Sequence, residues 1–246
     1  MSQNELRLAM LISDSGTTAR AIIKEYQHGG LRGVEPVCVI SSKVLPDVIQ
    51  NFRCLGFSME LKKFRVIVRR DYPIRFAFGR ALLECFQGMG VDLIGQYGWM
   101  PRTPENVIEA YDGRMINQHP GPLDPGRPDF GGLGMYGLRV HAARLFYVRG
   151  VGEGFWTEAT AQRVHREYDL GAVLHRRRVE ILKSDNPLTL RERVLPIEHE
   201  VQIETLRTYA EDRVTELVRE EPLVKVRHIR ILNEAKWIAE KLFPSG

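Results

Sequence analysis

Apolar and polar residues alternate in two ways along the first part of the chain. Residues 6–13 (LRLAMLIS) and 34–42 (VEPVCVISS) are nearly continuous apolar runs, which are typical of buried strands. Between them, residues 15–30 have the spacing of a helix and end in two glycines, a common stop signal for helices. This order predicts a strand, a helix and a second strand.

The same alternation continues to residue 119. It predicts helices over residues 46–56, 73–90 and 103–111, and strands over residues 91–97 and 113–119. Strands that are buried on both faces read as continuous apolar runs. The predicted fold class is therefore α/β, with a doubly wound, mostly parallel sheet.

The texture of the sequence changes beyond residue 150. Residues 157–167 and 171–182 read as two adjacent strands joined by the turn-prone EYDLG, and a long amphipathic helix is predicted to start after Asn186. Residues 221–243 read as a strand followed by a terminal helix. We expect one domain over residues 1–214, with residues 215–246 as a strand and helix packed on the same domain.

Composition excludes several classes of protein. The 246 residues are 43% hydrophobic and 27% charged, as in ordinary globular proteins. No apolar run approaches the ~18 residues of a membrane helix, and the N-terminus lacks the order of a signal peptide, so we expect a cytoplasmic protein. Cys38, Cys54 and Cys85 form no CxxC pair, which favours reduced, inert core thiols.

The net charge of +4 is compatible with phosphorylated small substrates or with nucleic acid. The basic runs at residues 62–70 and 175–182 read as solvated strand surfaces, and they carry no interleaved stacking aromatics. We therefore expect small-molecule partners, and neither a nucleic acid nor a membrane. A homodimer is left open.

Ligand-binding segments are expected at the carboxyl ends of the strands, which are residues 13–18, 96–103 and 117–126. In the first of these, Gly16 lies between a strand and a helix, a place where free backbone N–H groups can bind an anion. The hydroxyls of Ser15, Thr17 and Thr18 can add donors. The alternative is that Ser15 or Thr17 only caps the helix. The segment is not GxGxxG, so a dinucleotide site is not predicted.

The motif NQHP places Asn117 and His119 two residues apart at the end of a predicted strand. Residues at that spacing point to the same side of a strand, so an amide and an imidazole can both reach one carbonyl oxygen and stabilise negative charge on it. Pro120 and Pro122 would keep the exit stiff. The alternative is a histidine that only satisfies a buried backbone carbonyl.

Asp169 is a third candidate, in the turn between the two later strands. Ordinary turn chemistry explains an aspartate there as well. It acquires a chemical role only if it folds back onto His119.

Together these segments resemble the folate-dependent formyltransferases, and most closely those that act on glycinamide ribonucleotide. The resemblance rests on LISDSGTTARAII, on GWMPRTPENVIEAYDGRMIN, on NQHPG and on EYDLGAVL, and it covers most of residues 6–214. It implies a Rossmann-like formyltransferase catalytic domain over residues 1–214, and a one-carbon transferase of purine biosynthesis. The implied reaction moves a formyl group from the co-substrate 10-formyltetrahydrofolate to the primary amine of glycinamide ribonucleotide, without a metal.

The resemblance also implies roles for single residues. Asn117 and His119 would bind the formyl oxygen, and Asp169 would position His119 and a water. Glu198 would contact the amine substrate near its reacting end. The implied phosphate-binding residues are Ser15, Gly16, Thr17 and Thr18. The implied folate-binding residues are Met100, Arg102, Thr103, Arg166, Glu167 and Tyr168.

The chain also departs from the family's pattern. Asp14 and Ser15 replace the usual Gly and Asn, Pro101 replaces a common Arg, and residues from Gly121 differ. The glycines of residues 126–157 indicate either a mobile loop over the site or a pocket adapted to another amine. The alternative functions are therefore a formyltransferase for another amine, such as an amino-sugar nucleotide, and a non-catalytic folate- or nucleotide-binding homologue. The short tail after residue 214 argues against a methionyl-tRNA formyltransferase. The early first strand argues against a formyltetrahydrofolate deformylase.

Overall fold

The computed structural model describes residues 5–245. Its strands are β1 (Leu6–Ile12), β2 (Val34–Ser41), β3 (Phe64–Val66), β4 (Leu93–Gln96), β5 (Met115–His119), β6 (Trp156–Arg163) and β7 (Val173–Glu180). Its α-helices are α1 (Thr17–Gln27), α2 (Pro46–Arg53), α3 (Arg75–Gly88), α4 (Glu105–Ala110), α5 (Leu138–Val151), α6 (Pro187–Ala210) and α7 (Ile229–Leu242). Two short 3-10 helices are η1 (Arg69–Asp71) and η2 (Val226–His228).

The strands form one sheet in the order β3-β2-β1-β4-β5-β6-β7. The pairs from β3 to β5 are parallel, and β6 and β7 are antiparallel. The buried run in β1 explains its central place, because Leu8 to Ile12 are all fully buried. The predicted α/β class with a mostly parallel sheet is confirmed.

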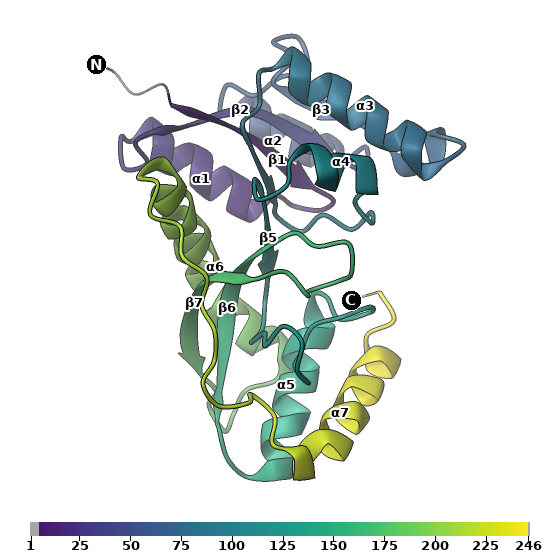
Figure 1. Cartoon of the computed structure of the whole chain (residues 1–246), viewed down its shortest axis with the longest axis vertical. Coiled ribbons are helices and arrows are strands. Elements are labelled where there is room, and N and C mark those ends of the chain that lie inside the picture. Colours follow the sequence, from purple (N-terminus) through teal and green to yellow (C-terminus); the bar gives the residue numbers. More distant parts are fainter. Residues whose placement is uncertain (1–4, 246) are drawn as a thin grey trace. The chain divides into compact units, whose positions relative to one another are not determined.

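The strand order reverses between β1 and β4. Crossovers between parallel strands are right-handed, so this reversal puts α1 and α2 on one face of the sheet and α3 and α4 on the other. These helices surround the first strands in Figure 1. The carboxyl ends of β1 and β4 therefore meet at the switch point, where ligands of such sheets bind.

The chain divides into two compact units. The first contains the described residues up to Asn117 together with residues 203–214, and the second contains residues 118–202 and those from Thr215 onward. The boundary falls inside strand β5 and again inside helix α6. The predicted domain bounds at residues 1–214 and 215–246 stay a prediction.

Two sequence expectations for the second unit are wrong. Residues 138–151 form helix α5, which is buried along most of its length, so this part is not a mobile loop. Residues 221–227 form no strand, because the N–H of Leu223 donates to the carboxylate of Asp124 at 2.9 Å in place of a sheet partner. The terminal helix is confirmed as α7, which packs beside α5 (Figure 1).

Charged groups are buried in the core of the second unit. The Arg144 guanidinium is 2% exposed and donates to the carbonyls of Trp156 and Gly154 at 2.7 and 2.9 Å. It also lies 4.6 Å from the ring centre of Trp156. The Glu158 carboxylate is 1% exposed and pairs with Arg219, whose side chain is 8% exposed, and with Arg178 at 3.6 Å. This acid supplies the counter-charge for Arg219, which would otherwise be buried without one.

The cysteines differ from the expectation of three core thiols. Cys38 on β2 is buried, Cys85 on α3 is partly buried, and Cys54 is exposed because it follows the last turn of α2. A hydrogen bond with Cys38 lowers the pKa of Cys85 to about 7, and the same bond together with burial raises the pKa of Cys38.

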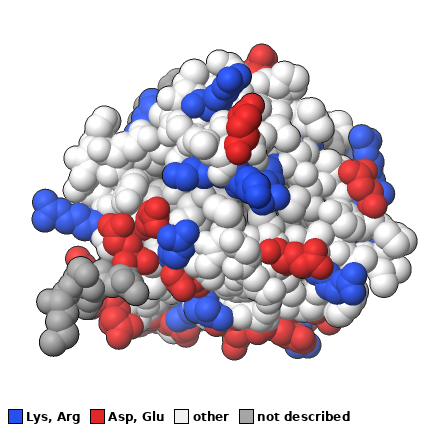
Figure 2. Space-filling model, turned by 90° about the horizontal axis from the view of Figure 1, so that it is seen from above, with Lys and Arg blue, Asp and Glu red and all other residues white. Residues whose placement is uncertain are grey.

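The surface carries charges of both signs. On the face in Figure 2, Lys and Arg side chains are interspersed with Asp and Glu and separated by uncharged areas. Within residues 5–245, no helix combines the length and the apolar character needed to cross a membrane.

Candidate active site

Asn117 and His119 lie on strand β5, as predicted. Because they are two residues apart on one strand, their side chains point to the same face. Asn117 pairs in register with Gln96 at the end of β4, which puts it at the carboxyl edge of the sheet. His119 is 3% exposed. The strand therefore presents an amide and a buried imidazole on one face.

Asp169 faces the imidazole of His119. Its Oδ2 lies 3.7 Å from Nδ1, and the carboxylate is 11% exposed. Asp169 adopts a left-handed backbone conformation with φ of +57°, which is uncommon for a residue other than glycine. The condition set by the sequence, that this aspartate folds back onto His119, is met.

Further groups hold the Asp169 carboxylate, and sequence reasoning missed them. The Gln162 amide donates to Oδ1 at 2.6 Å from strand β6, and the N–H of Gly132 donates to Oδ2 at 2.9 Å. Gly131 leaves the space that this arrangement needs, because a Cβ there would lie 2.7 Å from the Asp169 Cβ. The signal for Gln162 was weak, because β6 also carries threonines, a glutamate and an arginine, and nothing in the sequence sets this glutamine apart from them.

Unpaired polar atoms gather at the same place. Among the described residues, Nε2 of His119, Nδ1 of His141 and Oε1 of Gln162 are buried and have no hydrogen-bond partner. Burial holds the pKa of His141 at about 3, so its ring is neutral, and the nearby charges of Arg191 and His119 act in the same direction. Unpaired buried polar atoms are rare in proteins. Nε2 of His119 bonds no carbonyl, so this nitrogen is free to act on a ligand, and the catalytic role of the histidine stays a prediction.

The phosphate-binding candidates lie at the start of α1 in the first unit. Gly16 is the N-cap at φ +62°, and no side chain caps the helix, so the capping interpretation of Ser15 or Thr17 is wrong. A Cβ on Gly16 would lie 2.9 Å from the ring of Phe52, so only glycine fits here. Thr18 is buried, while Ser15 is exposed. The N–H groups of this 11-residue helix remain available to an anion.

The loop after β4 adjoins this turn. The hydroxyl of Ser13 accepts the N–H of Met100 at 2.8 Å, so that backbone donor is occupied. Thr103 is buried, and its hydroxyl bonds Gln96 at 2.6 Å, whereas Arg102 is exposed. Asp14, the residue that departs from the family pattern, is exposed. Binding of a folate by these residues stays a prediction.

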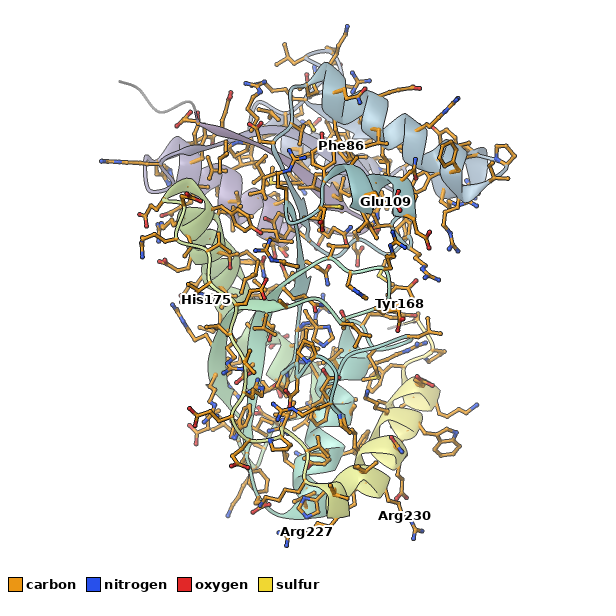
Figure 3. All side chains as sticks on the ribbon, viewed as in Figure 1. Phe86, Glu109, Tyr168, His175, Arg227 and Arg230 are labelled. Atoms are coloured by element: carbon orange, nitrogen blue, oxygen red, sulfur yellow. The ribbon has the colours of Figure 1, made fainter. Side chains whose placement is uncertain are left out.

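The remaining folate candidates lie on the turn between β6 and β7. Arg166, Glu167 and Tyr168 are exposed, and Figure 3 marks Tyr168 on this turn. The Glu167 N–H donates to His165 Nδ1 at 3.1 Å. These three residues directly precede Asp169 in the sequence. Their role in folate binding stays a prediction.

Residues 121–132 are held by several hydrogen bonds. The carboxylate of Asp129 accepts the N–H groups of Asp124 and Gly131 at 2.8 and 2.9 Å, and Arg127 bonds the Asp124 carboxylate at 2.7 Å. Burial raises the pKa of Asp129, whereas its two N–H donors act to lower it. Gly121 packs so closely that a Cβ there would meet Val140 at 2.3 Å. These bonds favour an ordered segment over the mobile-loop alternative.

Glu198 lies on α6 and is 4% exposed. Its carboxylate accepts the amide of Gln118 at 2.8 Å. Gln118 stands between Asn117 and His119 on the strand, so its side chain points to the opposite face of β5. Glu198 is thus bonded on that side of the strand, and its contact with a substrate stays a prediction.

The carboxyl of Glu198 is expected to make stability depend on pH. Burial raises its pKa from 4.5 to about 7, although Gln118 and Arg191 act to lower it. Between these two values the folded state holds a proton that the unfolded chain has lost, so the free energy of unfolding falls by ~3 kcal/mol as pH rises across this window. Urea unfolding of wild type and Glu198→Gln at several pH values checks this. The difference between their free energies of unfolding should change by that amount across the window, and free energies that run parallel with pH would contradict the prediction.

The comparisons with known proteins agree with the fold. The sequence profile of the formyl transferase family matches residues 6–206. The chloroplastic phosphoribosylglycinamide formyltransferase of Arabidopsis thaliana is 31% identical over 208 residues, which are 85% of this chain and 66% of that protein. The chain thus spans only 66% of that relative's length.

Bacterial relatives are matched over most of their length. The phosphoribosylglycinamide formyltransferase of Haemophilus influenzae is 25% identical over 85% of this chain and 89% of that protein. The crystal structure of glycinamide ribonucleotide transformylase 1 from Symbiobacterium toebii superposes with a TM-score of 0.72 at 28% identity, covering 87% of this chain and 95% of that one. Since the family profile covers far more than half of the 246 residues, the chain belongs to the formyl transferase family.

Proposed function

We propose that this protein transfers the formyl group of 10-formyltetrahydrofolate to the primary amine of glycinamide ribonucleotide, a step of purine biosynthesis. The observation that carries the proposal is the buried His119, with Nδ1 facing Asp169 at 3.7 Å and Nε2 without a partner. It lies on the same strand face as Asn117, in a chain of the formyl transferase family. The names of the relatives supply the amine substrate.

The residues of the site suit acyl transfer. The amine nitrogen attacks the formyl carbon, and the carbonyl oxygen takes negative charge as the new C–N bond forms. The amide of Asn117 and the imidazole of His119 donate hydrogen bonds to that oxygen. The bond from carbon to the folate nitrogen then breaks, and this nitrogen receives a proton that the amine has lost. Asp169 keeps the ring of His119 oriented, and no other step is assigned to it.

The unpaired buried atoms support the fit of a formyl donor. A formyl oxygen offers an acceptor to Nε2 of His119, which lacks one in the described part of the chain. The phosphate of the amine substrate is assigned to the Gly16 turn, where backbone N–H groups and the hydroxyls of Thr17 and Thr18 are the donors. Folate binding is assigned to the backbone around Arg102 and to the Arg166–Tyr168 segment.

A direct assay tests this assignment. Purified protein is mixed with 10-formyltetrahydrofolate and glycinamide ribonucleotide, and release of tetrahydrofolate is followed by its absorbance. We expect turnover with this amine to exceed turnover with an amino-sugar nucleotide by at least ~10²-fold, because a site built for one polar substrate leaves groups unpaired with another. Equal or higher rates with the amino-sugar nucleotide would redirect the function. Folate binding in calorimetry without turnover on any amine would favour a non-catalytic homologue.

We also propose that the protein works in the cytoplasm, and a homodimer is left open. The name of the Arabidopsis relative places that protein in the chloroplast, whereas the Haemophilus relative is bacterial. A fluorescent fusion in the source cell tests the location, and sedimentation equilibrium at several concentrations tests the assembly.

A further inference from the structure

Helix α7 lies beyond the part of the chain that matches the family profile, which ends at residue 206. It packs beside α5 in the second unit (Figure 1). Leu232, Ala235 and Ala239 form its buried face. Lys236 follows Ala235 on this helix, and its ammonium group donates to the carbonyl oxygen of Gly131 at 2.8 Å.

The carbonyl of Gly131 and the N–H of Gly132 belong to one peptide group. Lys236 donates to the oxygen of this group, and the nitrogen of the same group donates to Oδ2 of Asp169 at 2.9 Å. That oxygen is the one that faces Nδ1 of His119 at 3.7 Å. A single planar peptide therefore links a cation on α7 to the carboxylate that orients the imidazole.

The position of the cation strengthens this link. An ammonium at the carbonyl end draws electron density from the peptide, so its N–H becomes a better donor to a carboxylate. Hydrogen bonds with a charged partner are about twice as strong as neutral ones. Burial lowers the pKa of Lys236, while the carboxylates of Asp129, Asp169 and Glu240 act to raise it, so these carboxylates favour the charged form of the amine.

Glycine at both positions of the peptide serves this geometry. Gly132 has φ of +96°, a conformation that L side chains rarely adopt. A Cβ on Gly131 would lie 3.2 Å from Oδ2 of Asp169 and 2.6 Å from Leu123. The glycines that read as a mobile loop in the sequence thus let the backbone approach the carboxylate closely.

We propose that Lys236 is a positioning residue of the active site, which holds the peptide between residues 131 and 132 so that its N–H fixes Asp169 against His119. The inference rests on the proposed function for its kinetic consequence. It assigns a role to α7, which lies outside the family match. Lys236 itself touches no substrate.

The kinetic test compares three variants. Lys236→Met removes the ammonium and keeps an unbranched chain, and kcat is expected to fall about tenfold, with the KM of both substrates changed less than about threefold. Lys236→Arg keeps a cation and donors and should recover most of the lost rate. Lys241→Met makes the same chemical change at an exposed position of the same helix and should match wild type. Equal kcat for both Met variants would overturn the proposal.

A second measurement does not depend on the substrate. The amide proton of Gly132 is expected to resonate downfield in wild type, because it bonds a carboxylate, and to exchange about fivefold faster in Lys236→Met. Lys241→Met should leave both properties unchanged. If wild type fails to formylate any amine, the proposed function is lost, but this signal still decides whether Lys236 holds the peptide. An unchanged Gly132 signal in a folded Lys236→Met protein would mean that the lysine only stabilises α7.

Discussion

Replacing His119 by alanine is expected to lower kcat for formyl transfer by about 10³-fold. The imidazole is the donor on β5 whose Nε2 has no partner in the described chain, so its loss removes stabilisation that the reaction needs at the carbonyl oxygen. The KM for the folate should change little, because folate binding is assigned to other residues. Stopped-flow and steady-state measurements of tetrahydrofolate release check both values.

The control for this substitution is His28→Ala, at an exposed C-cap of α1 far along the chain from β5. It should retain wild-type kcat. His119 is buried, so the alanine variant must also be shown to fold, and we expect it to lose about 1–2 kcal/mol of unfolding free energy. A folded variant that keeps more than about a tenth of wild-type kcat would remove His119 from the assigned role.

Replacing Glu158 by glutamine is expected to destabilise the protein by about 3 kcal/mol. The carboxylate is 1% exposed and pairs with Arg219, a side chain that is itself 8% exposed. Glutamine keeps the shape and removes the charge, so the Arg219 guanidinium stays buried beside a neutral group. The melting temperature should fall by about 10 °C, as followed by circular dichroism.

Glu200→Gln is the matched variant for this experiment. Glu200 pairs with Arg177 on the surface, where both side chains are about half exposed. Exposed pairs contribute little, so this change should cost less than about 0.5 kcal/mol. Equal losses for the two variants would mean that burial of the Glu158 pair does not decide its effect.

The sequence predicted the parallel core well because burial on both faces leaves a clear pattern. The runs at residues 6–13 and 34–42 became β1 and β2, and the helix after Asn186 became α6. Helix α5 escaped because it is buried on most sides and carries Arg144 and His141 inside, so polar and apolar positions do not separate along it. The error at residues 221–227 is the reverse: the segment alternates like a strand and was predicted as one, but its backbone bonds the side chain of Asp124 and not a neighbouring strand.

The site was predictable where residues close in sequence cooperate. Asn117 and His119 share one strand, so their spacing alone puts them on one face. The pairing of His119 with Asp169 spans 50 positions of chain and was inferred from resemblance to a family. No local sequence pattern indicates the other contacts of the site, which are those of Gln162, Gly132 and Lys236. The contacts of Gly132 and Lys236 join residues far apart in the chain, and Gly132 acts through its main-chain N–H, which leaves no side-chain signal.

The left-handed backbone at Asp169 limits which amino acids can occupy this position. Alanine or leucine there would change two properties at once, because a bulkier L residue resists φ of +57° while the charge is also lost. Asparagine tolerates this conformation and has nearly the same shape. Drift at residue 169 is therefore confined to a very small set of amino acids, and Asp169→Asn is the one exchange that separates the cost of the missing charge from the cost of a misfitting chain.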